Sequence, residues 1–349
     1  MNIENTILRE DIEAICTSSL LDYTKIDHTT FLITGSTGLI GSIMVRSFLL
    51  RNEQYRAGIS MILPVRNIEK AKGLFGENDA ITYIESPIET LTLNDDISVD
   101  YIIHAASPTK SKYFITYPVE TLNTAVNGTQ RVLEIAKERQ VKGMVYLSSM
   151  EMYGVLDSEN VTENDLGYID PLNVRSSYSQ GKRTSELYCF SYMSEYDIPV
   201  KIARIAMTFG AGLPKTENRV YKYFADCILN KKDIVLKSSG TTCLNYSYTV
   251  DTVIGLLYIL LNGKKGEAYN LVGDKTNMNI LESAKWLAKE YGEGQVNVRV
   301  EIPKENAGFA PDNKMILSNE KLKSIGWKPH YTIKEGYKRL LEYLKNEAK

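Results

Sequence analysis

Residues 31–42 read Phe31-Leu-Ile-Thr-Gly-Ser-Thr-Gly-Leu-Ile-Gly-Ser42, an apolar run that breaks into three glycines. The run predicts a buried strand, and the apolar residues 42–50 predict a helix, so Gly35, Gly38 and Gly41 lie in the turn between them. A turn without Cβ atoms brings backbone N–H groups and the positive end of a helix dipole close to phosphate groups. The stretch therefore predicts the pyrophosphate-binding turn of a dinucleotide site, with an ordinary glycine-rich turn as the alternative.

The composition of the whole chain is that of an ordinary globular protein. Its 349 residues can bury a large core in one composite unit or in two closely joined domains. The net charge of −2 provides no broad basic field, so we expect neither nucleic acid nor an anionic membrane as a partner. Apolar runs such as residues 253–261 are far shorter than the roughly 20 residues that a bilayer span needs. We expect no membrane span.

Cysteine and histidine usage favours a reducing compartment without a metal site. The cysteines show no paired spacing and the histidines are scattered. These residues are Cys16, Cys189, Cys227 and Cys243, and His28, His104 and His330. The first five residues lack the basic segment and apolar stretch of a signal peptide. We therefore expect a cytoplasmic protein that binds no metal.

Strand and helix signals alternate up to about residue 205, after an amphipathic N-terminal helix whose apolar residues recur at helical spacing from Ile7 to Leu21. Strands are predicted at 31–34, 59–65, 80–84, 99–104, 143–147 and 200–205, and long helices at 119–137 and 176–196. Such alternation gives a parallel sheet with right-handed crossovers. The prediction is an α/β protein. Residues 1–205 form the N-terminal helix and a doubly wound dinucleotide-binding (Rossmann) domain, and residues 206–349 mainly form a smaller α/β substrate domain, with some segments returning to the first sheet.

The substrate domain has weaker signals. Strands are predicted at 233–236 and 245–249, and helices at 251–262, 279–291 and 333–345, the last of them after a turn at 326–329.

Residues at the ends of the predicted strands bear on the cofactor. After the second strand, a carboxylate would accept bonds from ribose hydroxyls, whereas an arginine suits a 2′-phosphate. Arg66 at this place favours NADP over NAD, with an exposed surface arginine as the alternative. After the fourth strand, the small residues Ala105 and Ala106 leave room for a ligand at the sheet's edge.

Tyr178 is the only one of the 23 tyrosines with a lysine four residues later. On a helix, Tyr178 and Lys182 share one face. The ammonium would lower the pKa of the phenol and could also bond a nicotinamide ribose, and Ser149 could hold the same substrate hydroxyl. The alternative is a half-buried tyrosine beside a solvated lysine.

Together these motifs resemble the extended short-chain dehydrogenase/reductase family, in its nucleotide-sugar epimerase, dehydratase and decarboxylase branch. The resemblance spans nearly the whole chain from about residue 30, over residues 34–41, 104–106, 148–154, Tyr178 with Lys182, 203–210 and 326–329. Within the branch, residues 104–108, Tyr113, 118–122 and 178–183 are most similar to UDP-glucuronate decarboxylases.

The resemblance implies a redox-neutral reaction on a nucleotide-diphosphate sugar. Tyr178, held by Lys182, takes the proton of a sugar 4-hydroxyl bonded by Ser149, a hydride passes to tightly retained NAD or NADP, and a 4-keto sugar results. The implied cofactor contacts are Gly35, Thr37, Gly38, Leu39, Ile40, Gly41, Arg66, Ala105, Ala106, Tyr178, Lys182 and Ile205. The implied substrate contacts are Ser107, Tyr113, Ser149, Met150, Met207 and Arg219. Family members commonly form homodimers through two helices, here those near 119–137 and 176–196.

The sequence departs from the family where the reaction is decided. Glu151 matches the glutamate of dehydratases and decarboxylases, but Met150 stands where dehydratases often have an aspartic acid and decarboxylases a serine, and a thioether cannot protonate a leaving hydroxyl. Leu244 replaces an arginine of decarboxylases, whose charge-assisted bonds leucine cannot make, and Met207 replaces an asparagine. Ala125 and Ser86 depart from a usual asparagine and from an adenine-binding aspartate.

Four functions remain open on these residues. A nucleotide-sugar epimerase comes first, because it needs only Ser149, Tyr178, Lys182 and the cofactor. A decarboxylase or 4,6-dehydratase using Glu151 is the second, and an NADPH-dependent ketone reductase, favoured by Arg66, is the third. The fourth is a nucleotide-binding protein without catalysis.

Overall fold

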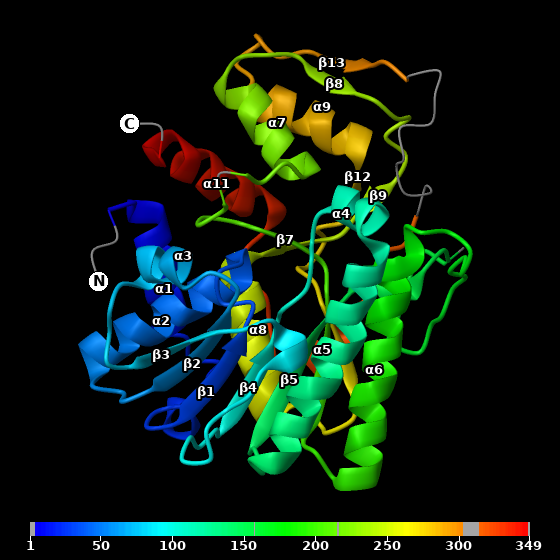
Figure 1. Ribbon diagram of the computed structural model, residues 1–349. Helices are drawn as coiled ribbons and strands as arrows, with labels where there is room; N and C mark the ends of the chain where they lie inside the picture. Colours follow the sequence, from blue (N-terminus) through cyan, green and yellow to red (C-terminus); the bar gives the residue numbers. More distant parts are fainter. Residues whose placement is uncertain (1–3, 157, 215, 303–313, 348–349) are drawn as a thin grey trace.

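The computed structural model describes residues 4–156, 158–214, 216–302 and 314–347. Its centre is a seven-stranded parallel sheet in the order β11-β6-β5-β4-β1-β2-β3 (Figure 1). The strands are β1 (Thr30–Thr34), β2 (Ser60–Val65), β3 (Ile81–Glu85), β4 (Tyr101–His104), β5 (Gly143–Ser149), β6 (Val200–Ile205) and β11 (Ala268–Leu271). Strand order reverses between β1 and β4, which is the point where doubly wound sheets bind ligands.

Helices cover both faces of this sheet, so its central strands are buried on both sides, whereas the edge strand β3 is only partly buried. Phe31 and Ile33 of β1 enter the core formed with α2 (Leu39–Tyr55) and α8 (Thr249–Asn262). Leu32 enters the opposite core, with residues of α5 (Pro118–Glu138) and α6 (Ser176–Tyr196). The predicted doubly wound α/β fold is therefore confirmed.

The second half of the chain adds a smaller α/β part and also returns to the main sheet. Figure 1 shows α7, α9, β8 and β13 grouped together above the sheet. The remaining strands are β7 (Met207–Phe209), β8 (Ile234–Leu236), β9 (Cys243–Leu244), β10 (Tyr246–Tyr248), β12 (Met278–Asn279) and β13 (Val298–Val300). The helices are α7 (Val220–Leu229), α9 (Ile280–Tyr291), α10 (Glu320–Ser324) and α11 (Ile333–Glu347). β11 lies at the edge of the seven-stranded sheet, while the boundary at residue 205 stays a prediction.

The predicted N-terminal helix is too long. The helix, α1 (Thr6–Cys16), ends before Leu21, because the Thr17 and Ser18 side chains bond nearby backbone groups and compete with helical hydrogen bonds. Leu21 is buried by a turn that follows the helix, not by a further helical turn. The short helices α3 (Ile68–Phe75), α4 (Ser111–Thr116) and α10 carried no clear periodic signal.

None of the described helices is both long and apolar enough to cross a bilayer.

One buried carboxylate joins the two ends of the chain. Asp11 of α1 is 1% exposed and accepts hydrogen bonds from the Tyr248 hydroxyl (2.6 Å) and from Arg339 Nε of α11 (2.8 Å). Burial raises the pKa of Asp11 to about 6, against the opposing effects of Tyr248 and Arg339. In the folded state Asp11 is therefore mostly neutral below about pH 6. Above that pH it is ionised, and Arg339 compensates its buried negative charge.

We predict that Arg339→Met lowers the free energy of unfolding by about 3 kcal/mol at pH 8, because it leaves the ionised Asp11 buried without its cation. At pH 5, where Asp11 is protonated, the loss should be much smaller. Urea unfolding at both pH values measures this difference. Arg9→Met, which removes an exposed ion pair to Glu13, serves as the control and should cost less than about 0.5 kcal/mol. An equal loss at both pH values would contradict the assigned role of Asp11.

Candidate active site

In the turn after β1, two of the glycine positions have no room for a Cβ atom. Gly35 has φ +70°, and a Cβ there would lie 2.6 Å from the Ala105 carbonyl oxygen. A Cβ on Gly41 would lie 2.5 Å from the Gly35 carbonyl oxygen. Gly38 is the N-cap of α2 and provides no side-chain cap, and the first turn of α2, which includes Leu39 and Ile40, carries no acidic residue. The N–H groups of that turn are thus free to bind an anion.

A buried hydroxyl beside this turn supports the same interpretation. Ser36 Oγ is buried and has no hydrogen-bond partner among the described residues. Its neighbour Thr37 is half-buried. The free helix terminus, the absent Cβ atoms and the unpartnered hydroxyl fit the pyrophosphate of a dinucleotide.

Thr34 fixes the neighbouring strand ends. Its Oγ1 accepts hydrogen bonds from the backbone N–H groups of Ala105 (3.1 Å) and Ala106 (3.0 Å), and lies 2.8 Å from His104 Nδ1. His104 Nε2 lies 3.1 Å from Thr129 Oγ1. Burial, with a smaller effect of the Lys182 charge, lowers the pKa of His104 to about 3. His104 is therefore neutral and connects two strands and α5.

The structure brings Ser149, Tyr178 and Lys182 together. Ser149 is the last residue of β5, paired in register with Ile205 of β6. Tyr178 in the first turn of α6 forms a side-chain hydrogen bond with Ser149. Lys182, one turn further along α6, donates from Nζ to the Leu147 carbonyl oxygen (2.6 Å), and Nζ lies 5.9 Å from the centroid of the Tyr178 ring.

The expected lowering of the phenol pKa is wrong for this structure. Burial, followed by the negative charge of Glu151, raises the pKa of Tyr178 to about 12, against the opposing effects of Ser149, Arg219 and Arg175. Burial also lowers the pKa of Lys182 to about 8, and its ammonium group is bonded to a carbonyl. The cost of removing a phenolate from water exceeds the effect expected from the lysine.

Sequence reasoning missed two residues near Tyr178: Phe114, which packs against it, and Arg175, which contacts Phe114 and Glu151. The Phe114 ring of α4 stacks on the Tyr178 ring at a centroid distance of 4.3 Å and an angle of 6°. The Arg175 guanidinium lies 4.9 Å from the Phe114 centroid, and Arg175 Nη2 donates to Glu151 Oε2 (2.8 Å). The position of Arg175, three residues before Tyr178, was a usable signal, because residues so spaced are neighbours at a helix start.

A third missed residue, Glu217, holds a predicted substrate residue. Arg219, the N-cap of α7, donates from Nε and Nη2 to the Glu217 carboxylate (3.0 and 2.6 Å). Burial opposes ionisation of Glu217, but the bonds and charge of Arg219 hold its pKa at about 2. The Arg219 charge also acts on Tyr178, so Arg219 belongs to the catalytic neighbourhood.

Other residues that the sequence analysis singled out have different neighbours. Met150 is half-buried in the short 3-10 helix Met150–Tyr153, and Met207 is half-buried in β7. Leu244 is 5% exposed in the main core, so its position provides no polar group for a ligand. Tyr113 packs on Tyr117, and the Ser107 hydroxyl donates to the Pro108 carbonyl oxygen.

Three further positions from the sequence analysis lie after strands β2 and β3 or within helix packing. Arg66 is exposed directly after β2, where Val65 pairs with Glu85 of β3. Ser86 follows β3, and its hydroxyl donates to the Pro87 carbonyl oxygen. Ala125 is buried between α5 and α6, and its carbonyl oxygen accepts from Ser185 Oγ (2.6 Å).

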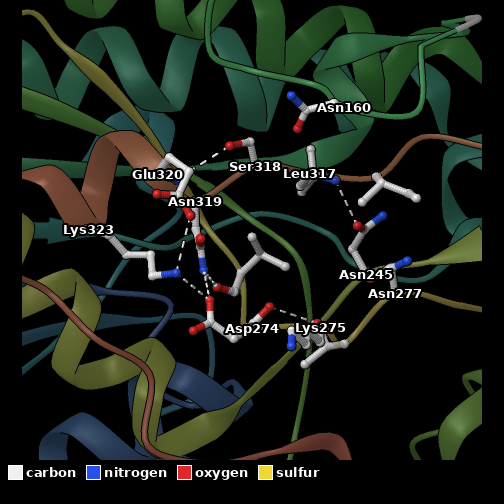
Figure 2. A pocket seen from close by; sticks show the side chains of 14 residues that line it. Asn160, Asn245, Asp274, Lys275, Asn277, Leu317, Ser318, Asn319, Glu320 and Lys323 are labelled. Carbon is white, nitrogen blue, oxygen red and sulfur yellow. Dashed lines mark hydrogen bonds and ion pairs between the residues drawn. The ribbon is translucent and has the colours of Figure 1, made fainter.

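A separate pocket of about 310 Å³ lies near the start of α10 (Figure 2). None of the predicted site residues, all of which the structure describes, lines it. Its polar side chains bond each other or the backbone: Asn319 Nδ2 donates to Asp274 Oδ1 (2.8 Å), Lys323 Nζ lies 3.1 Å from Asp274 Oδ1, and Asn245 Oδ1 accepts from Leu317 N–H (2.9 Å). These bonds join chain segments and suggest a structural junction.

Among the described residues, no group of three or more His, Cys, Asp or Glu side chains could hold a metal ion.

Comparisons with known proteins identify a matching family and relatives of this chain. The family model described as NAD dependent epimerase/dehydratase family matches residues 31–272. UDP-glucuronic acid decarboxylase 1 from Xenopus tropicalis is 26% identical over 97% of this chain and 79% of its own length. The dTDP-D-glucose 4,6-dehydratase from Homo sapiens is 25% identical over 89% of each chain.

Solved structures share the fold. A UDP-glucose 4-epimerase from Thermotoga maritima, with UDP-glucose, superposes with a TM-score of 0.76 at 22% identity, covering 92% of this chain and 100% of that one. A dTDP-glucose 4,6-dehydratase from Streptomyces venezuelae with NAD bound superposes with a TM-score of 0.73 at 21% identity, covering 91% and 98%.

We predict that Gly41→Ala abolishes dinucleotide binding, because the added methyl group would collide with the Gly35 carbonyl oxygen. Titration with NAD and NADP by calorimetry, and the thermal stabilisation that each ligand produces, measure the loss. A bound ligand at 100 times its dissociation constant should stabilise the wild type by about 2.7 kcal/mol. Gly73→Ala in α3, where nothing lies within 4 Å of the added Cβ, is the matched control and should bind normally. Equal binding by both variants would refute the assigned turn.

Proposed function

Because the chain belongs to the NAD-dependent epimerase/dehydratase family, we propose that it converts a nucleotide-diphosphate sugar through a 4-keto intermediate, with no net oxidation or reduction. The observation that carries this proposal is the hydrogen-bonded pair of Ser149 and Tyr178 at the end of β5, with Lys182 one helical turn away. The decarboxylase and dehydratase relatives support the substrate class.

Each residue has a role in this proposal. Ser149 orients the sugar 4-hydroxyl, and Tyr178 removes its proton and later returns one. A bound oxidised nicotinamide would supply a hydride acceptor and a positive charge that favours the Tyr178 phenolate. Lys182, fixed by the Leu147 carbonyl oxygen, would hold the cofactor ribose with its remaining N–H groups. Residues 35–41 bind the pyrophosphate, and Arg219 the substrate diphosphate.

Epimerisation at carbon 4 is the first candidate. It requires only that the ketone turn and be reduced on its other face, so Ser149, Tyr178, Lys182 and the cofactor suffice. Met150 supports this choice over dehydration, because a thioether cannot protonate a leaving hydroxyl. Leu244, buried in the core, likewise offers no cation to a sugar carboxylate.

A lyase is the second candidate, favoured by the place of Glu151. Its backbone N–H donates to Ser149 Oγ (3.2 Å), and the negative charge of its carboxylate raises the pKa of the Tyr178 phenol. From there Glu151 could act at carbon 5 or 6 of a 4-keto sugar, by decarboxylation or by elimination. The relatives named UDP-glucuronic acid decarboxylase support decarboxylation.

The choice of dinucleotide is also a proposal. Arg66 is exposed directly after β2, and a guanidinium can bond a 2′-phosphate in a bidentate manner. We therefore expect NADP to bind more tightly than NAD in the titrations above. Solved structures with the same fold contain NAD, which is the opposing observation.

We further propose a homodimer formed through α5 and α6, in the cytoplasm. Both helices expose large apolar side chains: Val119 is 63% exposed, Leu122 39%, Leu187 64% and Phe190 50%. A second copy would cover these side chains. The four cysteines are free, which suits a reducing compartment.

We predict that Tyr178→Phe lowers turnover by about 10²-fold or more, because the sugar hydroxyl loses its general base. Binding of the dinucleotide should be nearly unchanged. A panel of UDP- and dTDP-sugars, followed by mass spectrometry and NMR, measures turnover, and calorimetry measures binding. Tyr188→Phe in the same helix is the control. Wild-type turnover by Tyr178→Phe would exclude Tyr178 as the base.

Glu151→Gln separates the two candidate reactions. We expect little effect on epimerisation, because Glu151 takes no proton there, and a loss of about 10²-fold or more in a lyase. Carbon dioxide release from a UDP-uronic acid, and the stereochemistry at carbon 4 by NMR, identify the reaction. A large loss of activity with a purely epimerised product would contradict this division.

We predict that Leu187→Glu converts the dimer to a monomer, because it places a charge in the apolar contact. Sedimentation velocity measures the mass. Ile302→Glu, at an equally exposed apolar residue outside α5 and α6, should leave the dimer intact. A monomeric wild type would refute the proposed interface.

A further inference from the structure

Arg175 connects two features of the catalytic neighbourhood. It is the N-cap residue of α6, its side chain is 16% exposed, and its Nη2 lies 2.8 Å from Glu151 Oε2. The same guanidinium lies 4.9 Å from the centroid of the Phe114 ring. A single side chain thus contacts both the acid beside Ser149 and the ring that covers Tyr178.

The Phe114 ring is itself fixed in place. It is 1% exposed and stacks on Tyr178 almost in parallel. The Ser177 hydroxyl donates to the Phe114 carbonyl oxygen (3.2 Å), which fastens α4 to the first turn of α6. A ring held in this way limits the motion of the Tyr178 side chain. The guanidinium adds a cation–π contact to it.

Charges of both signs lie around the Tyr178 hydroxyl. Glu151 supplies a negative charge, and Arg175 and Arg219 supply positive charges, of which Arg219 is paired with Glu217. From β5 the neutral Tyr146 faces the same space, and Lys182 lies one turn along α6. Removal of the Arg175 charge would leave Glu151 uncompensated beside a buried phenol.

We propose that Arg175 is a positioning residue, which holds the Glu151 carboxylate beside the catalytic tyrosine and supports the Phe114 ring stacked on it. The proposal rests on the proposed function, because it takes Tyr178 as the general base. The hydrogen bond from Arg175 fixes the position of the carboxylate of Glu151, whose backbone N–H is bonded to Ser149 Oγ.

The test compares Arg175→Gln, Arg175→Lys and the double variant Arg175→Gln/Glu151→Gln with the wild type, all loaded with dinucleotide. The pH dependence of kcat/KM reports the ionisation of the base. Arg175→Gln should move the acidic limb of the profile upward by about one pH unit, and Arg175→Lys by less. The double variant should return to the wild-type position or below it, because it removes both charges.

Arg139→Gln is the matched control. Arg139, the C-cap residue of α5, has a side chain that is 14% exposed. It donates hydrogen bonds to the carbonyl oxygens of Leu93 and Asn94. Its removal should leave the profile in place. Urea unfolding of each variant measures its stability. A shift caused only by lost stability would persist when Glu151 is also replaced.

A second measurement is independent of turnover. The ¹³Cζ resonance of Tyr178, assigned by its loss in Tyr178→Phe, should titrate at higher pH in Arg175→Gln than in the wild type. In the double variant it should titrate at the wild-type pH or below it. If no nucleotide sugar reacts but this shift is seen, the proposed function fails and the positioning role stands. If the titration of Tyr178 is the same in wild type and Arg175→Gln, or if the double variant is shifted as far as Arg175→Gln, the positioning role is refuted.

Discussion

The close contact between Gly35, Gly41 and the strand end at Ala105 is the constraint on which the site depends. Backbone meets backbone there at distances that exclude any Cβ, so β1, α2 and β4 have one relative placement. Thr34 reinforces it by accepting two N–H groups from the end of β4. Because β5 pairs with β4, this contact also fixes Ser149 relative to the uncapped start of α2. The turn thereby fixes the position of Ser149, a proposed substrate residue, relative to the proposed cofactor residues.

The second determinant is the cost of burying charge. Tyr178, Lys182 and His104 lie together in the interior, where the uncharged form of each is favoured: the pKa of the phenol is about 12, that of the lysine about 8 and that of the histidine about 3. Near pH 7 the phenol and the imidazole are therefore uncharged, while the lysine ammonium keeps its charge and its hydrogen bond to the Leu147 carbonyl oxygen. Two carboxylate–guanidinium pairs, Glu151 with Arg175 and Glu217 with Arg219, surround these residues. They supply fixed charges without leaving any of them unpaired in the interior.

The fold could be predicted from the sequence because its signals are local and repeated. Glycine spacing identified the β1 turn, and hydrophobic periodicity located α5 and α6 to within a residue or two of their observed ends. The proposed catalytic group was predicted from one i, i+4 pair, Tyr178 with Lys182. Phe114 and the pairing of Arg175 with Glu151 could not be predicted, because each depends on segments that meet only in three dimensions: α4 on α6, and the start of α6 on the residues after β5. The direction of the Tyr178 pKa shift was wrong because burial, which one sequence does not reveal, outweighs a neighbouring cation.

The meeting of the chain's two ends has a consequence for biosynthesis. The Asn5 side chain donates to the carbonyl oxygen of Tyr343 (3.1 Å) and Asp11 accepts from Arg339, so α1 is completed by residues more than 300 positions away. During synthesis α1 leaves the ribosome long before α11 does. Asp11 therefore has no contact with Arg339 until α11 has been made. Chains that stop before α11 would therefore leave Asp11 without its cation and uncover the part of α1 that packs on α11.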